Sequence, residues 1–163
     1  MNSTPFGPAG ADGIGQESHM TKIIVTGVDD SDTAAAAARK AAEIAAAFGG
    51  RLHILSAYGD LDAETINIGT DEILVSNEQE AEQTVHKVLA ELRQTYPELE
   101  ITSAASEGRP GEALVKAAEN LNADLIVLGN KRVQGIARVL GSIAKDVAAH
   151  APCDVYIAHT HHR

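Results

Sequence analysis

The sequence predicts an α/β fold in which a five-stranded parallel sheet carries helices on both of its faces. Short apolar runs rich in β-branched residues alternate with longer stretches of helical periodicity, and strands separated by helices pair in parallel through right-handed crossovers. Trp is absent and aromatic residues make up only 3% of the chain, so Ala, Val, Ile and Leu must fill the core. Such a core is typical of helices packed on a parallel sheet.

The 163 residues are enough for one well-buried core, so we expect one domain. Residues 1–19 are rich in Gly, Pro and polar residues, lack Lys and Arg, and show no periodicity, which predicts a flexible leader. The Ser18-His19-Met20 triplet resembles a cloning junction and makes Met20 the natural first residue. We therefore expect the folded domain over residues 20–160, with a tail at residues 161–163.

The first two strands are expected at residues 22–28 and 51–58. Between them, residues 30–32 offer capping oxygens for a helix that residues 49–50, both Gly, bring to an end. Residues 59–75 have no firm period and are expected to form a flexible flap. The apolar face of the helix is predicted to comprise Ala34, Ala38, Ala41, Ile44 and Phe48.

A long second helix is predicted to begin at a capping box formed by Ser76 and Gln79 and to end near Tyr96. Its apolar periodicity predicts a face packed on the sheet, and a third strand is expected at residues 99–105. The predicted apolar positions of this helix are Val85, Val88, Leu89 and Leu92.

After the third strand, the sequence predicts two more helices, and each is followed by a strand. A third helix follows residues 108–111, a fourth strand is expected at 124–128, a fourth helix at 142–150, and a fifth strand at 154–159. The inward face of the third helix is predicted to include Ala113, Leu114, Ala117 and Leu121.

Composition excludes several classes of function. A net charge of −10 argues against a nucleic-acid-binding protein, because such proteins normally carry a basic surface. No apolar run approaches a membrane span and no signal peptide is apparent, which favours a cytoplasmic protein.

Cys153 is the only cysteine and is expected to be a small apolar core residue. The histidines at 159, 161 and 162 are expected to belong to a solvated tail and not to a metal site.

Ligands of open parallel sheets bind beyond the carboxyl ends of the strands, where the winding direction reverses. There, residues 129–142 join the fourth strand to the fourth helix and contain three glycines, a hydroxyl at Ser142 and the cations Lys131, Arg132 and Arg138. Glycine backbone, a helix N-terminus and positive charge together are suited to binding phosphate. The alternative is that the glycines only permit a tight loop and that the cations face solvent.

Asp29 follows the first strand and faces the same region. Its carboxylate could accept hydrogen bonds from a ribose hydroxyl or an adenine amino group. Alternatively, Asp29 is a turn or cap residue, a role for which Asp30 and Ser31 are equally suited.

These segments resemble the universal stress protein family. The resemblance rests on Gly-Val-Asp-x-Ser at 27–31, on Ala-Asp-Leu-Ile-Val-Leu-Gly at 123–129, on Gly-Ser at 141–142 and on Ala-Pro-Cys at 151–153 before a last strand. It covers residues 20–159 and implies a Rossmann-like fold of the adenine nucleotide α-hydrolase-like kind. It also implies an adenine nucleotide as ligand, ATP or cyclic AMP, with magnesium as a companion ion.

In nucleotide-binding members of this family, a Gly-x-x-Gly followed by nine residues and Gly-Ser or Gly-Thr contacts the phosphates. The first-strand Asp contacts the nucleoside, and backbone at the end of the second strand meets adenine. In this chain Arg132 stands in place of the second glycine, and the spacing from Gly129 to Gly141 is one residue shorter, so that Gly135 is the nearest substitute. The candidate nucleotide-binding residues are Val28, Asp29, Ala57, Gly129, Asn130, Arg132, Gly135, Gly141 and Ser142.

Three functional hypotheses follow from the resemblance. The first is a binding module in which nucleotide occupancy is the signal, and Asn130 with the Ala-His-Thr ending resembles actinobacterial members that favour cyclic AMP. The second is a protein-interaction module without nucleotide, and the third is a slow ATPase or self-phosphorylating enzyme with Ser142 as acceptor. Family members commonly pair the last strand across a two-fold axis, so a homodimer through residues 154–159 is expected.

Overall fold

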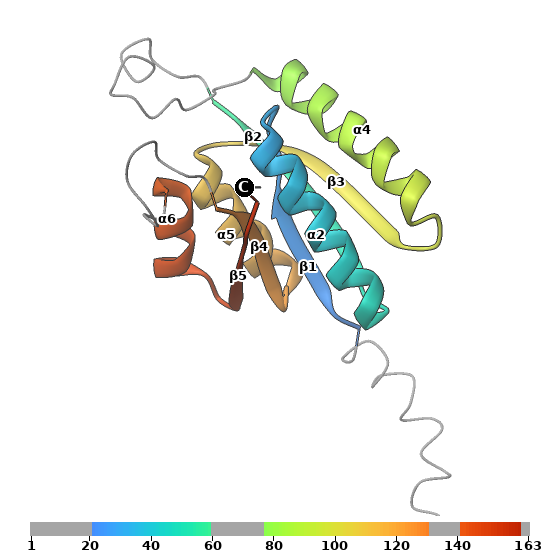
Figure 1. Cartoon of the computed structure of the whole chain (residues 1–163). Coiled ribbons are helices and arrows are strands. Elements are labelled where there is room, and N and C mark those ends of the chain that lie inside the picture. The colour runs from blue at the N-terminus through green and yellow to red at the C-terminus, as the bar shows by residue number, and fades with distance from the viewer. Residues whose placement is uncertain (1–20, 60–76, 131–140, 161–163) are drawn as a thin grey trace, which may run out of the picture.

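The computed structural model describes residues 21–59, 77–130 and 141–160. Five strands and four helices alternate along the described chain (Figure 1). The strands are β1 (Ile23–Gly27), β2 (Arg51–Tyr58), β3 (Glu100–Glu107), β4 (Leu125–Gly129) and β5 (Asp154–Ala158). The helices are α2 (Asp32–Phe48), α4 (Glu78–Thr95), α5 (Pro110–Leu121) and α6 (Ser142–His150). Each strand begins and ends within two residues of its predicted limits.

The strands form one sheet in the order β3-β2-β1-β4-β5, and every neighbouring pair is parallel. Helices α2 and α4 pack on one face of the sheet, while α5 and α6 cover the other (Figure 1). The predicted fold class is confirmed. Because the chain winds outward from β1 to β3 and then resumes at β4 on the other side of β1, the winding direction reverses between β1 and β4.

The core consists of two apolar layers, one on each face of the sheet. Alanines of α2 lie against Ile24, Leu52 and Val127 on one face, and Leu114 and Val147 meet Val25 and its neighbours on the other. Small alanine side chains let α2 approach the sheet closely, which explains how a core without Trp is filled. The buried hydroxyl of Thr26, between β1 and β4, donates to the carbonyl of Val127 at 2.9 Å.

Two predicted helix faces are partly wrong, and both errors lie in the last turn. Phe48 is 60% exposed and Leu121 is 37% exposed, whereas both were expected to face the core. Each is the final residue of its helix, where Gly49 (φ 65°) or Asn122 (φ 53°) turns the chain away from the sheet. The positions buried beyond those predicted are Ala37, Ala42, Ala45, Ala81, Val115 and Ala118.

The start of α4 also differs from the prediction. Asn77, not Ser76, is the N-cap, and its side-chain oxygen accepts a hydrogen bond from the backbone N–H of Glu80 at 2.8 Å. Asn is as good an N-cap as Ser, and Asn77 with Glu80 has the same spacing as the predicted pair. The capping signal was therefore real but shifted by one residue. Ser76 itself lies outside the described residues.

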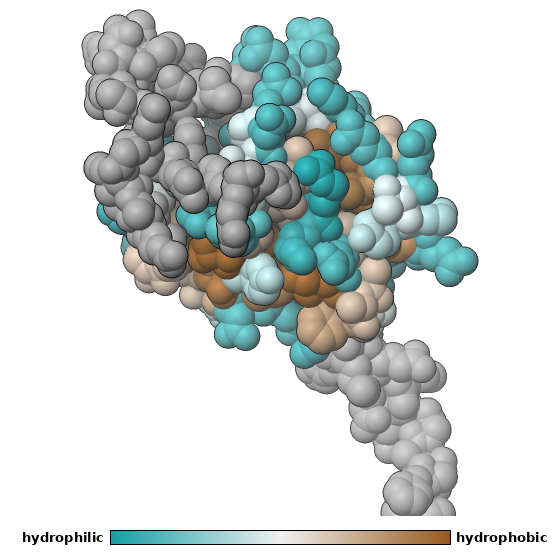
Figure 2. All heavy atoms as spheres, viewed as in Figure 1, coloured by the Kyte–Doolittle hydropathy of each residue, from teal (hydrophilic) through white to brown (hydrophobic). Residues whose placement is uncertain are grey.

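Strand β5 lies at one edge of the sheet, as predicted, and pairs with β4. Its residues alternate in exposure, and Tyr156 is 41% exposed. Figure 2 has the same view as Figure 1 and shows apolar surface beside the place where Figure 1 draws β5. Among the described helices, none is long and apolar enough to cross a membrane.

Candidate functional site

The region where the winding direction reverses is bounded by the ends of β1 and β4 and by the first turns of α2 and α6 (Figure 1). Both helices follow a strand and run back along the sheet, so their N-termini lie at its carboxyl edge. The backbone N–H groups and partial positive charge of two helix N-termini therefore face this region. This is the place in which sequence reasoning put a ligand.

Val28 and Asp29 lie at the exit of β1. Val28 is buried, and its N–H donates to the carbonyl of Leu55 at 2.8 Å, which fixes the backbone at this point. The exposed Asp29 accepts the N–H of Ser31 through Oδ1 at 2.7 Å, and the Ser31 hydroxyl caps α2 by accepting from Ala34 N at 3.1 Å. Asp29 is thus a turn residue, while its Oδ2 has no hydrogen-bond partner among the described residues. Both of its predicted roles are compatible with this geometry.

Gly129 ends β4 and lies directly against the first turn of α2. A Cβ at this position would be 2.6 Å from Thr33 Cγ2 and 2.9 Å from the Thr33 carbonyl oxygen. Packing alone therefore requires glycine here, whatever binds nearby. The next residue, Asn130, is half-buried, and its carbonyl accepts a hydrogen bond from the Thr160 hydroxyl at 3.2 Å.

Gly141 and Ser142 begin α6. A Cβ at Gly141 would meet nothing within 4 Å, and its φ of −69° is accessible to any residue, so no contact within the described part of the chain requires glycine. No side chain of the described residues caps α6, and Ser142 is exposed. Within the described ranges, the first N–H groups of this helix therefore have no side-chain partner. Arg132 and Gly135, together with Lys131 and Arg138, lie outside the described residues.

Ala57 lies near the end of β2 and is half-buried. The pairing of β1 with β2 ends at Gly27 and Leu55, two residues before Ala57. Because successive residues of a strand direct their peptide groups to opposite neighbours, Ala57 directs its N–H and C=O to the same side as Leu55. Beyond the end of β1, these two groups have no strand to pair with among the described residues, so an adenine edge could pair with them.

The described part of the site is rich in carboxylates. Asp29 and Asp30 are exposed at the end of β1, and Asp32 lies in the first turn of α2. These charges oppose the approach of a polyphosphate but suit the hydroxyls of a ribose. Across the described ranges, no cluster of three or more His, Cys, Asp or Glu is placed to hold a metal ion.

Cys153 lies on the opposite edge of the sheet from this site, just before β5. It is half-buried and packs against the apolar layer of α5 and α6. Burial, together with the nearby charges of Asp154 and Asp124, raises the pKa of its thiol above the ordinary value. A protonated thiol is a poor nucleophile, which agrees with the apolar role expected for this cysteine.

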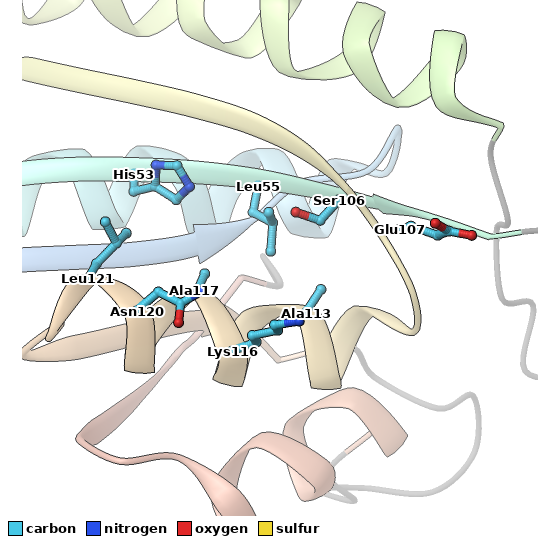
Figure 3. Close-up of a pocket in the computed structure, with 9 residues that line it drawn as sticks. All are labelled: His53, Leu55, Ser106, Glu107, Ala113, Lys116, Ala117, Asn120 and Leu121. Atoms are coloured by element: carbon cyan, nitrogen blue, oxygen red, sulfur yellow. The ribbon is translucent and has the colours of Figure 1, made fainter.

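Sequence reasoning did not predict a groove of about 390 Å³ between α5 and the strands β2 and β3. Figure 3 shows side chains from all three elements facing this space, with His53 near one end and Glu107 near the other. Its polar members Lys116 and Asn120 are exposed. The groove lies away from β4 and α6, and none of the predicted site residues lines it.

Sequence reasoning also missed Thr33 and Thr160, which contact Gly129 and Asn130. The Ala-His-Thr ending of residues 158–160 was noted only for its resemblance to other sequences. Contacts between residues 30 or more apart leave no local pattern, so these roles could be found only from the structure.

Comparison with known proteins gives a consistent result. The model of the universal stress protein family matches residues 20–159. A universal stress protein of Mycobacterium tuberculosis is 34% identical over 145 residues, which cover 85% of this chain and 97% of that protein. A universal stress protein solved in complex with cAMP is similar in structure (TM-score 0.62, 29% identity, 87% of this chain and 99% of that chain). A universal stress protein of Lactobacillus plantarum has a TM-score of 0.65 and 27% identity, covering 85% of this chain and 97% of that chain.

Proposed function

The chain belongs to the universal stress protein family, and we propose that it binds an adenine nucleotide at the carboxyl ends of β1 and β4. In this proposal it acts as a dimeric sensor or regulator of a stress response in the cytoplasm, where adenine nucleotides are abundant. Occupancy of the site is the signal, and turnover is not needed.

The observation that carries the proposal is the start of α6. No contact with the described residues requires glycine at position 141, and Gly141 precedes a helix N-terminus that none of their side chains caps. A close approach of ligand to backbone explains a glycine of this kind, and unpaired N–H groups at a helix N-terminus are suited to a phosphate. We therefore assign the phosphate to Gly141, Ser142 and the backbone around Gly129 and Asn130, with Arg132 and Gly135 as further candidate contacts.

The nucleoside is assigned to the other side of the site. Asp29 retains one carboxylate oxygen for a ribose hydroxyl, and Ala57 has backbone groups free for the edge of adenine. Val28, which precedes Asp29, is buried and donates its N–H to the carbonyl of Leu55, and in this proposal it supplies an apolar floor. A carboxylate and a strand edge recognise a nucleoside without any net positive charge.

A single phosphate fits the described residues better than three. The carboxylates Asp29, Asp30 and Asp32 repel a triphosphate unless a cation such as magnesium intervenes. The structural neighbour with cAMP is 29% identical to this chain. We therefore propose cyclic AMP as the first ligand to test and ATP with magnesium as the second.

The proposed dimer forms through β5. This strand has an unpaired edge among the described residues and displays Tyr156, and an apolar strand edge is suited to pairing with a second copy of itself. A two-fold contact of this kind is the commonest symmetry of soluble oligomers.

Calorimetric titration with cyclic AMP and with ATP, each with and without magnesium, tests the proposal. Asp29→Asn is expected to weaken nucleotide binding about tenfold, because a charged hydrogen bond to the ribose is lost. The asparagine keeps an oxygen for the N–H of Ser31, so the turn persists. Asp124→Asn is the matched control, since Asp124 also accepts one backbone N–H, from Ile23, but at the opposite edge of the sheet.

If the purified dimer binds neither nucleotide at millimolar concentration, the proposal is wrong. Arg132 and the shortened glycine spacing would then favour the second candidate, a protein-interaction module of the same family that works without nucleotide. Creation of ATP affinity by Arg132→Gly in such a protein would support that alternative.

A further inference from the structure

Thr160 connects the end of the last strand to the point where the chain leaves β4. Residues Gly129 and Ala158 are the last pair of the β4–β5 ladder. Two residues further on, the Thr160 hydroxyl donates to the carbonyl of Asn130 at 3.2 Å, and both residues are half-buried. A side-chain hydrogen bond thus continues the pairing after the backbone ladder has ended.

The methyl group of Thr160 acts on the same stretch of backbone. A Cβ at Gly129 would lie 3.4 Å from Thr160 Cγ2 and 2.6 Å from Thr33 Cγ2. The Cα of Gly129 is therefore flanked by two threonines, one from the first turn of α2 and one from the extension of β5. Together with the hydrogen bond to Asn130, these contacts restrict where the backbone can go as it leaves the sheet.

We propose that Thr160 is a positioning residue of the nucleotide site, which holds the Gly129–Asn130 backbone in the conformation that meets the phosphate. The inference rests on the proposed function. Without the hydroxyl, this backbone samples more conformations when empty, and nucleotide binding must supply the ordering. Since Thr160 is placed beside the phosphate side of the site and not the nucleoside side, its loss should weaken the binding of phosphate-bearing ligands selectively.

The test compares Thr160→Val and Thr160→Ser with the parent protein. Valine keeps the β-branched shape and removes the hydrogen bond, whereas serine keeps the hydroxyl. Affinities for cyclic AMP, AMP and adenosine are measured by titration, and the thermal stability of the empty protein is measured in parallel. Thr95→Val is the matched control, because the Thr95 hydroxyl also donates to a backbone carbonyl, that of Glu91, at the far end of α4.

We expect Thr160→Val to weaken cyclic AMP and AMP roughly three- to tenfold, the loss of one hydrogen bond, and to leave adenosine affinity unchanged. Thr160→Ser should retain most of the affinity, and Thr95→Val should retain all of it. If Thr160→Val binds all three ligands as the parent does, or weakens all three equally, Thr160 is not a positioning residue. If the parent itself binds none of the ligands, the proposed function has failed and not this step alone.

Discussion

Two glycines of the candidate site have different physical reasons to be glycine. Gly129 is required by packing, since a side chain would collide with the backbone and methyl group of Thr33. At Gly141, a Cβ would meet none of the described residues within 4 Å, and the backbone conformation is ordinary. We therefore expect substitution of Gly129 to change mainly the stability of the fold and substitution of Gly141 to change mainly nucleotide binding.

Gly129→Ala is expected to reduce the free energy of unfolding by about 1–3 kcal/mol, because α2 must shift to admit the methyl group. Urea denaturation measures this change. Gly141→Ser should be close to neutral in the same assay, since serine is a good N-cap for α6. The serine side chain should nevertheless weaken nucleotide binding, as it occupies space that the ligand approaches. Equal stability losses in the two variants would contradict this division of roles.

His53 makes the stability of the fold depend on pH. Its Nδ1 shares a hydrogen bond of 2.8 Å with the Thr102 hydroxyl on the neighbouring strand, and burial lowers the pKa of His53 below its ordinary value of 6.5. As the pH falls below 6.5, the unfolded chain takes up a proton at this position more readily than the folded chain. The contribution of His53 to stability is thus present at neutral pH and is lost in acid.

When the pH is lowered from about 7.5 to about 5.5, the free energy of unfolding of His53→Gln is accordingly expected to decrease less than that of the parent protein. Chemical denaturation at the two pH values gives the comparison. His86→Gln, at an exposed histidine of α4, is the control for the effect of exchanging a histidine for glutamine. An unchanged pH dependence in His53→Gln would show that other groups are responsible.

Among the described helices, α2 and α4 begin with a side-chain cap, whereas α5 and α6 begin without one. Ser31 caps α2 and Asn77 caps α4, and each side chain accepts one backbone N–H of its helix, from Ala34 and from Glu80. Helix α5 starts with Pro110, which carries no N–H, whereas α6 begins at Gly141 with no side-chain cap from the described part of the chain. An uncapped helix at the carboxyl edge of a parallel sheet is where an anion would complete the structure.

Asn77→Ala is expected to cost about 1 kcal/mol in the free energy of unfolding, because the N–H of Glu80 loses its partner. Asn77→Asp should retain the stability, since aspartate caps equally well and adds a favourable charge at the helix N-terminus. Thermal denaturation of the three proteins decides the question. A neutral Asn77→Ala would mean that α4 is held by its apolar face alone.

For the whole molecule, the two edges of the sheet differ in character. Strand β3 displays polar side chains such as Glu100 and Thr102, and Glu100 pairs with Arg51 of β2 at 3.1 Å. Strand β5 instead displays Tyr156 beside half-buried Val155 and Ile157. Charged and polar edges resist association, so the dimer is expected at β5 and not at β3.

Tyr156→Lys should shift the protein from dimer to monomer, because a two-fold contact brings the new charges of both copies together. Sedimentation analysis over a range of protein concentrations measures the shift. Gln94→Lys, which adds the same charge on the exposed side of α4, should leave the association unchanged. A Tyr156→Lys protein that associates as the parent does would place the contact elsewhere.

The helices and strands differ in how far the sequence predicts them. The strands and helices were predictable because the period of the apolar residues and the glycine or capping residues at the helix ends are local properties of the sequence. The family was predictable because its motifs are local as well. In α2 and α5, Ala38, Ala41, Ala113 and Leu114 are buried as predicted, but Phe48 and Leu121 are exposed, and neighbouring alanines were missed. The apolar period predicts which side of a helix faces the sheet, but it does not predict where the helix ends. In the last turn, the end of the helix decides whether a side chain on that side still contacts the sheet.

The sequence by itself determined the α/β architecture and the family, and it predicted a site at the carboxyl ends of β1 and β4. Only the tertiary structure decided that Gly129 serves packing against Thr33, that Asp29 uses one oxygen for Ser31 and leaves the other without a described partner, and that Thr160 bonds Asn130. The reason is physical. Local patterns report the conformation of neighbouring residues, whereas contacts between β4, α2 and β5 join parts of the chain that meet only after the sheet has formed.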